Sequence, residues 1–278
     1  MRGRVRAEGE KDRPGLPRFR DIRIPRYKLA IQIMAGVLVI LPDFTFRRLF
    51  FFDIGPLGEL NWLRYPLSLL WMVGLSNAVN FIDGVDGLAG GISTLAALSY
   101  ALIFGSFFNN GSTVLLCLCL AAVLGGFLVF NLPLPGARIF MGDGGSQFLG
   151  FMLAFLPLID TNSLPLPYAA VLLSIPIFDT FAAIWRRLRD HKRIDSPDRL
   201  HVHHKLMNLG LGTRGVDGVL YTLQIVLGIL VFLSVQQAEK PLSLIFLGAA
   251  YAVSVGFFTA IHFMNRRLTV PGDKKNGS

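Results

Sequence analysis

The chain has 278 residues, 53% of them hydrophobic, and its 27 lysines and arginines against 18 aspartates and glutamates give a net charge of +9. Mean hydropathy is +0.53, and the apolar residues form long blocks in place of the alternating pattern of a soluble domain. These features exclude an ordinary soluble globular protein and predict an all-α, polytopic membrane helical bundle. Cys117 and Cys119 share one apolar block at i and i+2, on different helix faces, so we expect them to pack and to form neither a disulfide nor a metal site.

Eight apolar segments are predicted to be transmembrane helices, although some are shorter than the ~20 residues that a perpendicular span needs. In chain order they cover about residues 29–42, 63–81, 88–108, 113–130, 147–159, 167–185, 218–235 and 242–263. They divide the chain into a basic N-terminal segment (1–28), a transmembrane domain (29–264) and a tail (265–278).

Lysine and arginine are distributed unevenly over the predicted loops. With a cytoplasmic N-terminus and alternating spans, 23 of the 27 bases face the cytoplasm, and four (Arg47, Arg48, Arg64 and Lys240) face outward. Such an asymmetry sets membrane orientation, which accounts for most of the basic excess, so we expect no nucleic-acid partner. In this orientation three polar segments, 77–87, 131–146 and 186–216, all face the cytoplasm.

The first polar segment, NAVNFIDGVDG, lies where one apolar block ends and before the next begins. Its oxygen-bearing side chains are Asn77, Asn80, Asp83 and Asp86. Helical spacing puts the two asparagines on one face, and Gly84 and Gly87 then break the helix and let a ligand approach the backbone. A polar helix end with a glycine cap is the structural alternative. Polar groups at this depth usually mark a functional site, and they suit a hard cation such as Mg²⁺.

The second polar segment runs from Asn131 to Ser146 and contains FMGDGGS. Glycines flank Asp143 on both sides, so its carboxylate is unobstructed and nearby amides can bind anionic oxygens. Arg138 adds a positive charge, and Ser146 is expected to cap the next helix. A plain tight turn would have a similar sequence, but its position between two spans favours metal or phosphate binding.

The third polar segment, SPDRLHVHHK, carries His201, His203 and His204 beside Arg199 and Lys205. Three histidines could bind a transition metal, but histidine among basic residues is more typical of phosphate binding. Asp179, near the end of the sixth span, either pairs with Arg186 or Arg187 on its own helix or belongs to the site. Together the three segments suit a sugar nucleotide diphosphate, a divalent cation and a lipid as second substrate.

At these motifs the chain resembles the polyprenyl-phosphate N-acetylhexosamine-1-phosphate transferases, in a form more similar to the WecA type than to the MraY type. NAVNFIDGVDGLAGG, Asn131 with FMGDGGSQFLG, and PDRLHVHH carry the resemblance, which covers about residues 21–264. It implies a bacterial inner-membrane enzyme that moves a sugar 1-phosphate from a UDP-N-acetylhexosamine to polyprenyl (undecaprenyl) phosphate and releases UMP, in the synthesis of a lipid-linked cell-envelope glycan. The identity of the sugar and the oligomeric state are left open.

The resemblance also assigns roles to residues. It implies that Asn80 and Asp143 bind Mg²⁺, with Mn²⁺ as an alternative. It also implies that Asn77, Asp83 and Asp86 are nucleotide and metal-site neighbours and that the pyrophosphate-binding loop is formed by His201, His203 and His204 with Arg199. With the basic residues of the polar segments added, we expect catalytic roles for Asp83, Asp86, His203 and His204. We expect substrate contacts from Asn77, Arg138, Arg199, His201 and Lys205.

One departure from the family pattern concerns an adjacent Asp-Asp pair, which family members carry just before the stretch corresponding to residues 23–32. This chain has no such pair, and its nearest carboxylates are Asp12 and Asp21. The resemblance therefore implies an N-terminally truncated chain, and a catalytically impaired relative is the main alternative to an active enzyme. A transporter is a weaker alternative, because the polar groups lie at helix ends on one side and the sequence has no internal repeat.

Overall fold

Apolar helices form nearly all of the regular structure, as the hydropathy pattern predicts. The computed structural model describes residues 25–49, 52–132, 136–159, 164–191 and 201–269. The helices are α1 (Pro25–Ile40), α2 (Arg64–Ile82), α3 (Leu88–Ile103), α4 (Gly111–Asn131), α5 (Gly142–Phe155), α6 (Leu166–Leu172), α7 (Ser174–Arg189), α8 (Val202–Asn208), α9 (Thr213–Gln236) and α10 (Leu242–Thr269). Two short antiparallel strands, β1 (Arg48–Leu49) and β2 (Phe52–Asp53), form a hairpin before α2.

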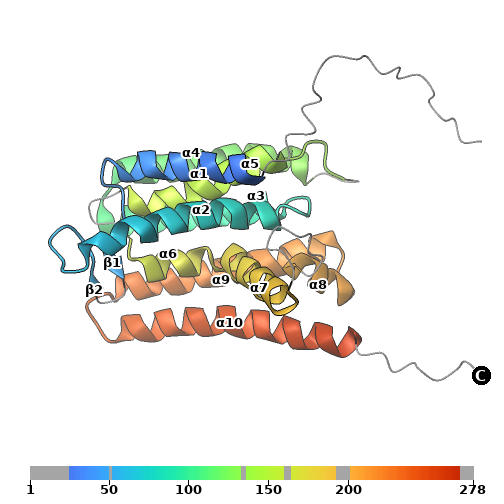
Figure 1. The fold of residues 1–278 in the computed structure, drawn as a ribbon. Helices are drawn as coiled ribbons and strands as arrows, with labels where there is room; N and C mark the ends of the chain where they lie inside the picture. Colours follow the sequence, from blue (N-terminus) through green and yellow to red (C-terminus); the bar gives the residue numbers. More distant parts are fainter. Residues whose placement is uncertain (1–24, 50–51, 133–135, 160–163, 192–200, 270–278) are drawn as a thin grey trace, which may run out of the picture.

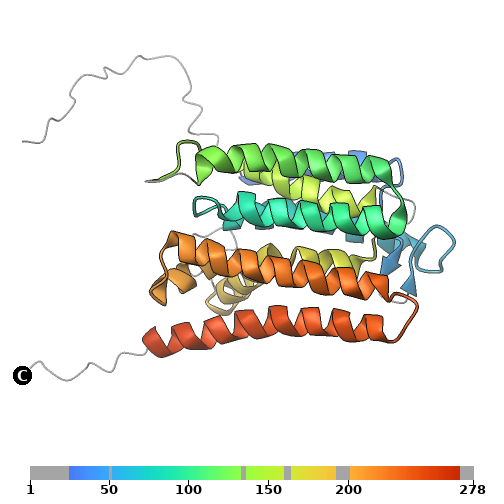
Figure 2. The same ribbon diagram turned by 180° about the vertical axis from the view of Figure 1, so that it is seen from behind.

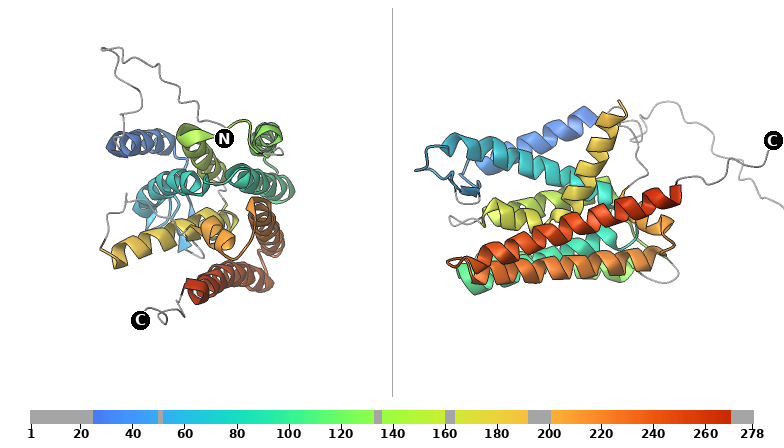
Figure 3. Two further views of the ribbon diagram at one scale, coloured as in Figure 1. Left: turned by 90° about the vertical axis from the view of Figure 1, so that its right-hand side faces the viewer. Right: turned by 90° about the horizontal axis from the view of Figure 1, so that it is seen from below.

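The long helices lie side by side with α2 and α3 at the centre (Figures 1 and 2). Helix α2 packs against α1, α5 and α7, whereas α3 packs against α4 and α9, and α10 covers α9. Figure 3 shows the bundle end-on, with α10 at its periphery. Many outward-facing side chains are large and apolar, among them Leu70, Leu115 and Val123, which are 63–70% exposed. An apolar exterior around an apolar core is what a lipid environment requires, and the chain is a multi-pass membrane protein.

Within the described part of the chain, five helical segments are long and apolar enough to cross a membrane, and the bent pair α6–α7 would make six. A helix lies at each of the eight predicted spans, but α1 has 16 residues and α5 has 14. Both are shorter than the ~20 residues that a perpendicular span requires. The described residues thus hold a helix at each predicted span, some of them short as expected, and five or six of these helices are long and apolar enough to cross a membrane.

The sixth predicted span is two helices, α6 and α7, that meet at an angle of 84°. Pro176 lies in the first turn of α7 and has no N–H to donate to the carbonyl of Leu172, four residues earlier. The side chain of Gln224 on α9 supplies the missing donor, with 2.9 Å between its Nε2 and that carbonyl oxygen. A backbone carbonyl that the break leaves free inside the membrane is thereby satisfied. The bend is stabilised by this hydrogen bond, and it directs α7 toward the other polar segments.

Candidate functional site

The three polar segments meet at one end of the bundle, which we call the motif end (Figure 1). It comprises the α2–α3 turn (residues 83–87), the first turn of α5 and the short helix α8. The hairpin of β1 and β2 lies at the opposite end. The expectation that the three segments share one side of the membrane domain is confirmed.

Asn80 of α2 connects the first segment to the second. Its Nδ2 donates to Ser146 Oγ at 2.8 Å and lies 3.5 Å from Asp143 Oδ1. The two helices approach closely because α5 has a glycine where they cross: a Cβ at Gly150 would lie 2.8 Å from the Cα of Ser76. The amide nitrogen of Asn80 thus faces both residues, and no hydrogen bond to its amide oxygen is found among the described residues.

The expected cap at Ser146 is wrong. Helix α5 begins at Gly142, so the glycines around Asp143 form its first turn and Ser146 lies inside the helix. The Ser146 hydroxyl donates to the carbonyl of Gly142 at 3.0 Å and accepts from Asn80. Gly142 has a φ of +68°, which lets the chain turn sharply into the helix. Asp143 therefore stands at a helix N-terminus, where a negative charge is stabilised.

Asp143 and Asp83 have opposite electrostatic surroundings. The ammonium group of Lys28 on α1 lies 2.7 Å from Asp143 Oδ2, and this hydrogen bond lowers the pKa of the Asp143 carboxyl. Asp83, at the end of α2, is half-buried; burial and then the charge of Asp143 raise the pKa of Asp83 to about 6. The carboxylates of Asp83 and Asp143 thus interact beside the Asn80 side chain, at a place where a positive charge is favoured.

The side chains of this cluster are of the types that bind a divalent cation. Carboxylate and amide oxygens are the ligands that Mg²⁺ prefers, and the Lys28 ammonium shows that the Asp143 carboxylate already accepts a cation. Among the residues that the structure describes, no group of three or more His, Cys, Asp or Glu side chains is assembled for a metal. Protein sites for Mg²⁺ often supply only one or two carboxylates, with waters and substrate phosphates completing the shell.

The α2–α3 turn is held rigidly from two sides. Gly87 has a φ of +86°, its N–H donates to Asn131 Oδ1 at 2.7 Å, and its carbonyl accepts from Tyr221 Oη at 2.6 Å. Asp86 Oδ2 accepts from the N–H of Ala137 at 3.4 Å. The turn therefore presents its carboxylates on a fixed backbone, a precondition for a well-defined binding site.

The histidine segment reaches the same turn. His203 is buried against Gly84, where a Cβ would lie 3.0 Å from the His203 ring. The rings of His201 and His203 are nearly parallel, and their centroids are 5.9 Å apart. The centroid of the His204 ring is 4.3 Å from that of His203. Burial, followed by the charge of His204, lowers the pKa of His203 to about 4. His203 is therefore a neutral imidazole at physiological pH and can accept a hydrogen bond.

Asp179 pairs with His201 and not with Arg186 or Arg187. One carboxylate oxygen lies 2.6 Å from His201 Nδ1, and the other accepts from the N–H of Val202 at 2.7 Å. The two arginines lie a further two turns along α7, whereas the start of α8 lies directly beside Asp179. The alternative that Asp179 belongs to the site fits the structure, and the alternative of a helix-internal ion pair does not.

The other predicted site residues have different surroundings. The Asn77 amide exchanges two hydrogen bonds with Gln32 of α1, which joins α1 to α2. The Arg138 side chain is exposed, and Lys205 is buried near α10, whose Asn265 donates to the Lys205 carbonyl. Arg199 lies outside the described residues.

Two basic residues near the motif end are additions to the predicted set. Lys28 is the ion-pair partner of Asp143 described above. Arg187 is 6% exposed, its guanidinium lies 5.7 Å from the centre of the Phe81 ring, and its Nε and Nη1 have no partner among the described residues. A buried guanidinium of this kind is costly unless an anion binds it. In the sequence both residues look like ordinary topology-setting bases, because only the fold puts them beside the motifs.

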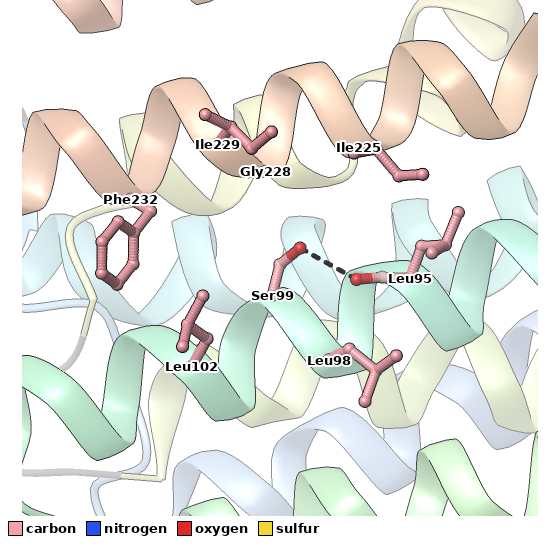
Figure 4. A pocket seen from close by; sticks show the side chains of 8 residues that line it. All are labelled: Leu95, Leu98, Ser99, Leu102, Ile225, Gly228, Ile229 and Phe232. Carbon is pink, nitrogen blue, oxygen red and sulfur yellow. Dashed lines mark hydrogen bonds between the residues drawn. The ribbon is translucent and has the colours of Figure 1, made fainter.

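A separate groove of about 230 Å³ lies between α3 and α9 (Figure 4). Leucine, isoleucine and phenylalanine side chains line most of it. Its hydroxyl group, Ser99 Oγ, already donates to the carbonyl of Leu95 at 2.9 Å. The groove therefore offers an apolar surface but none of the groups that phosphoryl or acid–base chemistry needs.

Comparisons with known proteins find one matching family model and several similar transferases. Residues 22–160 match the model of glycosyl transferase family 4. A probable undecaprenyl-phosphate N-acetylglucosaminyl 1-phosphate transferase of Bacillus subtilis is 36% identical over 211 residues, which cover 73% of this chain and 57% of that protein. An undecaprenyl-phosphate α-N-acetylglucosaminyl 1-phosphate transferase of Escherichia coli K12 is 34% identical over 167 residues, which cover 58% of this chain and 44% of that protein. The chain spans about half the length of these relatives.

Proposed function

The chain belongs to glycosyl transferase family 4, and from this membership we propose that it transfers an N-acetylhexosamine 1-phosphate from a UDP-sugar to a polyprenyl phosphate and releases UMP. An oxygen of the acceptor phosphate attacks the β-phosphorus of the donor, and the bond from that phosphorus to the bridging oxygen breaks. The products are a polyprenyl diphosphate sugar and UMP. Such a transfer depends mainly on positioning and on stabilising the negative charge of the phosphates.

The observation that carries this proposal is the meeting of an oxygen-ligand cluster and a basic, histidine-bearing segment at one turn. Asn80 and Asp143 lie close together where α2 ends, and His203 contacts Gly84 in the turn that follows. A nucleotide diphosphate needs both environments at once: a cation for its phosphates and donors for the remaining oxygens. The names of the relatives favour an active transferase over a catalytically impaired relative.

Mg²⁺ would be held by Asn80 and Asp143, with Asp83 close by, and Mn²⁺ is the alternative ion. When bound, it would neutralise phosphate charge and stabilise the charge that builds as the leaving group departs. Lys28 would then give up its contact with Asp143 and hold a phosphate oxygen. Two guanidinium nitrogens of Arg187, Nε and Nη1, have no partner among the described residues and offer a further phosphate contact beside Phe81.

The remaining site residues have roles that follow from their charge and surroundings. Neutral His203 accepts or donates a hydrogen bond next to the turn, and His204 adds a half-buried imidazole beside it. Asp83, whose pKa is about 6, can take up a proton near neutral pH. Asp86, Arg138 and Lys205 complete the polar surroundings of the donor.

We place the protein in a bacterial inner membrane with its motif end facing the cytoplasm, where UDP-sugars are found. The excess of lysine and arginine in the loops on that side supports this orientation. A membrane setting also gives the site access to a lipid acceptor.

The proposed function is tested with the purified full chain in detergent, supplied with Mg²⁺, polyprenyl phosphate and radiolabelled UDP-N-acetylglucosamine. Formation of a lipid-linked labelled sugar together with UMP is the expected result. Binding of the UDP-sugar without product would favour the catalytically impaired relative, and absence of both binding and product would overturn the assignment.

A further inference from the structure

We propose that Asp179 is a positioning residue for the histidine segment: it keeps the proton of His201 on Nδ1 and thereby presents His201 Nε2 to the donor phosphates. This inference rests on the proposed function and adds a residue to the machinery of that site. Asp179 lies on α7, more than twenty residues before the histidines.

The geometry gives Asp179 two contacts to successive residues of the histidine segment. Oδ2 lies 2.6 Å from His201 Nδ1, and Oδ1 lies 2.7 Å from the backbone nitrogen of Val202. Asp179 is 1% exposed and His201 is 7% exposed, so water does not compete for these contacts. A buried carboxylate with two hydrogen bonds of this length is rigidly placed.

The consequence for His201 follows from hydrogen-bond chemistry. A carboxylate only accepts, so the nitrogen that faces it must carry the hydrogen. His201 Nε2 is therefore the acceptor in the neutral ring, and it becomes a second donor when the ring is protonated. Either state directs the functional nitrogen away from Asp179, on a ring that lies between those of Phe81 and His203. Replacing an aspartate that orients a functional histidine commonly reduces binding or activity about as much as replacing the histidine itself.

The hydrogen bond from the Val202 N–H to Asp179 positions the rest of the histidine segment. Val202 is the first residue of α8. Its N–H therefore has no acceptor within the helix itself, as at every helix N-terminus. By accepting from it, Asp179 anchors the start of α8, and His203 follows one residue later against Gly84. One carboxylate thus sets both the proton of His201 and the position of His203.

The position of Asp179 in turn depends on the break between α6 and α7. If residues 166–189 formed one straight helix, α7 would not run toward α8. The bend of 84°, with the Leu172 carbonyl satisfied by Gln224, sets the direction of α7.

The test is a double-mutant cycle on the full chain, built from Asp179→Asn and His201→Asn. The asparagine at 201 keeps a donor near the place of Nδ1 but has no counterpart of Nε2. We expect each single variant to weaken UDP-N-acetylglucosamine binding in Mg²⁺ by roughly 10- to 100-fold. Asp179→Asn keeps an oxygen that can accept from the Val202 N–H, so its effect on affinity should act through His201. The double variant should therefore be no more than about twofold weaker than His201→Asn alone. Asp190→Asn, an exposed carboxylate at the end of α7, is the control and should bind as the unchanged chain does.

The second readout is the histidine tautomer, observed by NMR with ¹⁵N-histidine. The chain has five histidines, so the signals can be assigned by substitution. We expect His201 to carry its proton on Nδ1 in the unchanged chain and to lose that preference in Asp179→Asn. Additive effects in the cycle, or an unchanged His201 tautomer, would overturn the proposal. A third outcome is that the tautomer changes as expected but the unchanged chain does not bind the UDP-sugar. That result would contradict the proposed function, whereas the role of Asp179 toward His201 would still hold.

Discussion

Lys28 and Asp143 are 115 positions apart in the sequence, yet Lys28 Nζ lies 2.7 Å from Asp143 Oδ2. This ion pair joins α1 to the first turn of α5 and holds a positive charge beside the Asn80 amide. It is exposed, so its own contribution to stability is small. Its importance is chemical, because it holds a lysine ammonium against the carboxylate that we propose to bind the divalent cation.

Asp143→Asn is expected to abolish Mg²⁺-dependent turnover and to weaken Mg²⁺-dependent UDP-sugar binding by at least 10-fold. The asparagine amide keeps an oxygen but lacks the negative charge that a hard cation needs. Asp53→Asn, at the hairpin end, is the matched control and should leave both unchanged. Isothermal titration calorimetry with and without Mg²⁺ measures the effect. Equal losses in the two variants would reject the site assignment.

Asp83→Asn is expected to stabilise the protein at pH 7 while it impairs turnover. The folded-state pKa of Asp83 is about 6, above its unfolded value, so the folded chain binds the proton more tightly. That contribution to stability is fully present below about pH 4 and is lost as the pH rises through 6. Removing the charge should restore on the order of 1 kcal/mol or less at pH 7, since Asp83 is half-exposed and water screens it.

Thermal unfolding in detergent without Mg²⁺ measures this difference between about pH 3 and pH 7.5. The gap between Asp83→Asn and the unchanged chain should close as the pH falls below about 4. A gap that is constant over this range would show that burial does not disfavour the Asp83 charge.

Gly84→Ala is expected to lower turnover about 10-fold with little change in stability. The new Cβ would lie 3.0 Å from the His203 ring, so the ring or the turn must shift by a few tenths of an ångström. Small displacements of catalytic groups are costly in rate. Gly74→Ala on α2, where a Cβ meets nothing within 4 Å, is the control. Steady-state kinetics beside thermal unfolding separates the two effects, and equal activity in both variants would contradict the contact.

Gly150→Ala is expected to destabilise the bundle by about 1–3 kcal/mol. Its Cβ would meet the backbone of Leu75 and Ser76 on α2, and backbone atoms cannot move aside as a flexible side chain can. Gly125→Ala on α4, with open space around it, should be neutral. The unfolding temperature of each purified variant is the measurement. An undiminished value for Gly150→Ala would show that α2 and α5 are less tightly packed than the structure indicates.

The membrane orientation predicts the behaviour of reporter fusions. A periplasmically active alkaline phosphatase should be inactive when fused after Ser278 and active when inserted after Gly58, next to the β1–β2 hairpin. The expected contrast follows from the basic loops at the motif end. The opposite pattern would place the site on the outer side, away from a cytoplasmic UDP-sugar.

The sequence by itself determines the helices, the two faces of the Cys117–Cys119 pair and the three polar segments, because these depend on local composition. Apolar blocks must be buried or face lipid, and glycines and carboxylates at their ends mark where the chain leaves them. Cys117 is buried and Cys119 exposed, as i and i+2 spacing predicts. The oxygen-bearing side chains of the first polar segment and Asp143 can be recognised from local sequence. The family resemblance singles out Asn80 and Asp143 among them, and these two side chains lie close together in the structure.

Only the tertiary structure decides how side chains from different helices pair. Asp179 with His201, Lys28 with Asp143 and Gln224 with the Leu172 carbonyl each join distant elements. Hydropathy records whether a residue prefers lipid or water, but it carries no information about which neighbour satisfies a buried charge. The same limit explains the bent sixth span and the early start of α5: backbone hydrogen bonds at a proline or glycine depend on what a neighbouring helix can donate or accept.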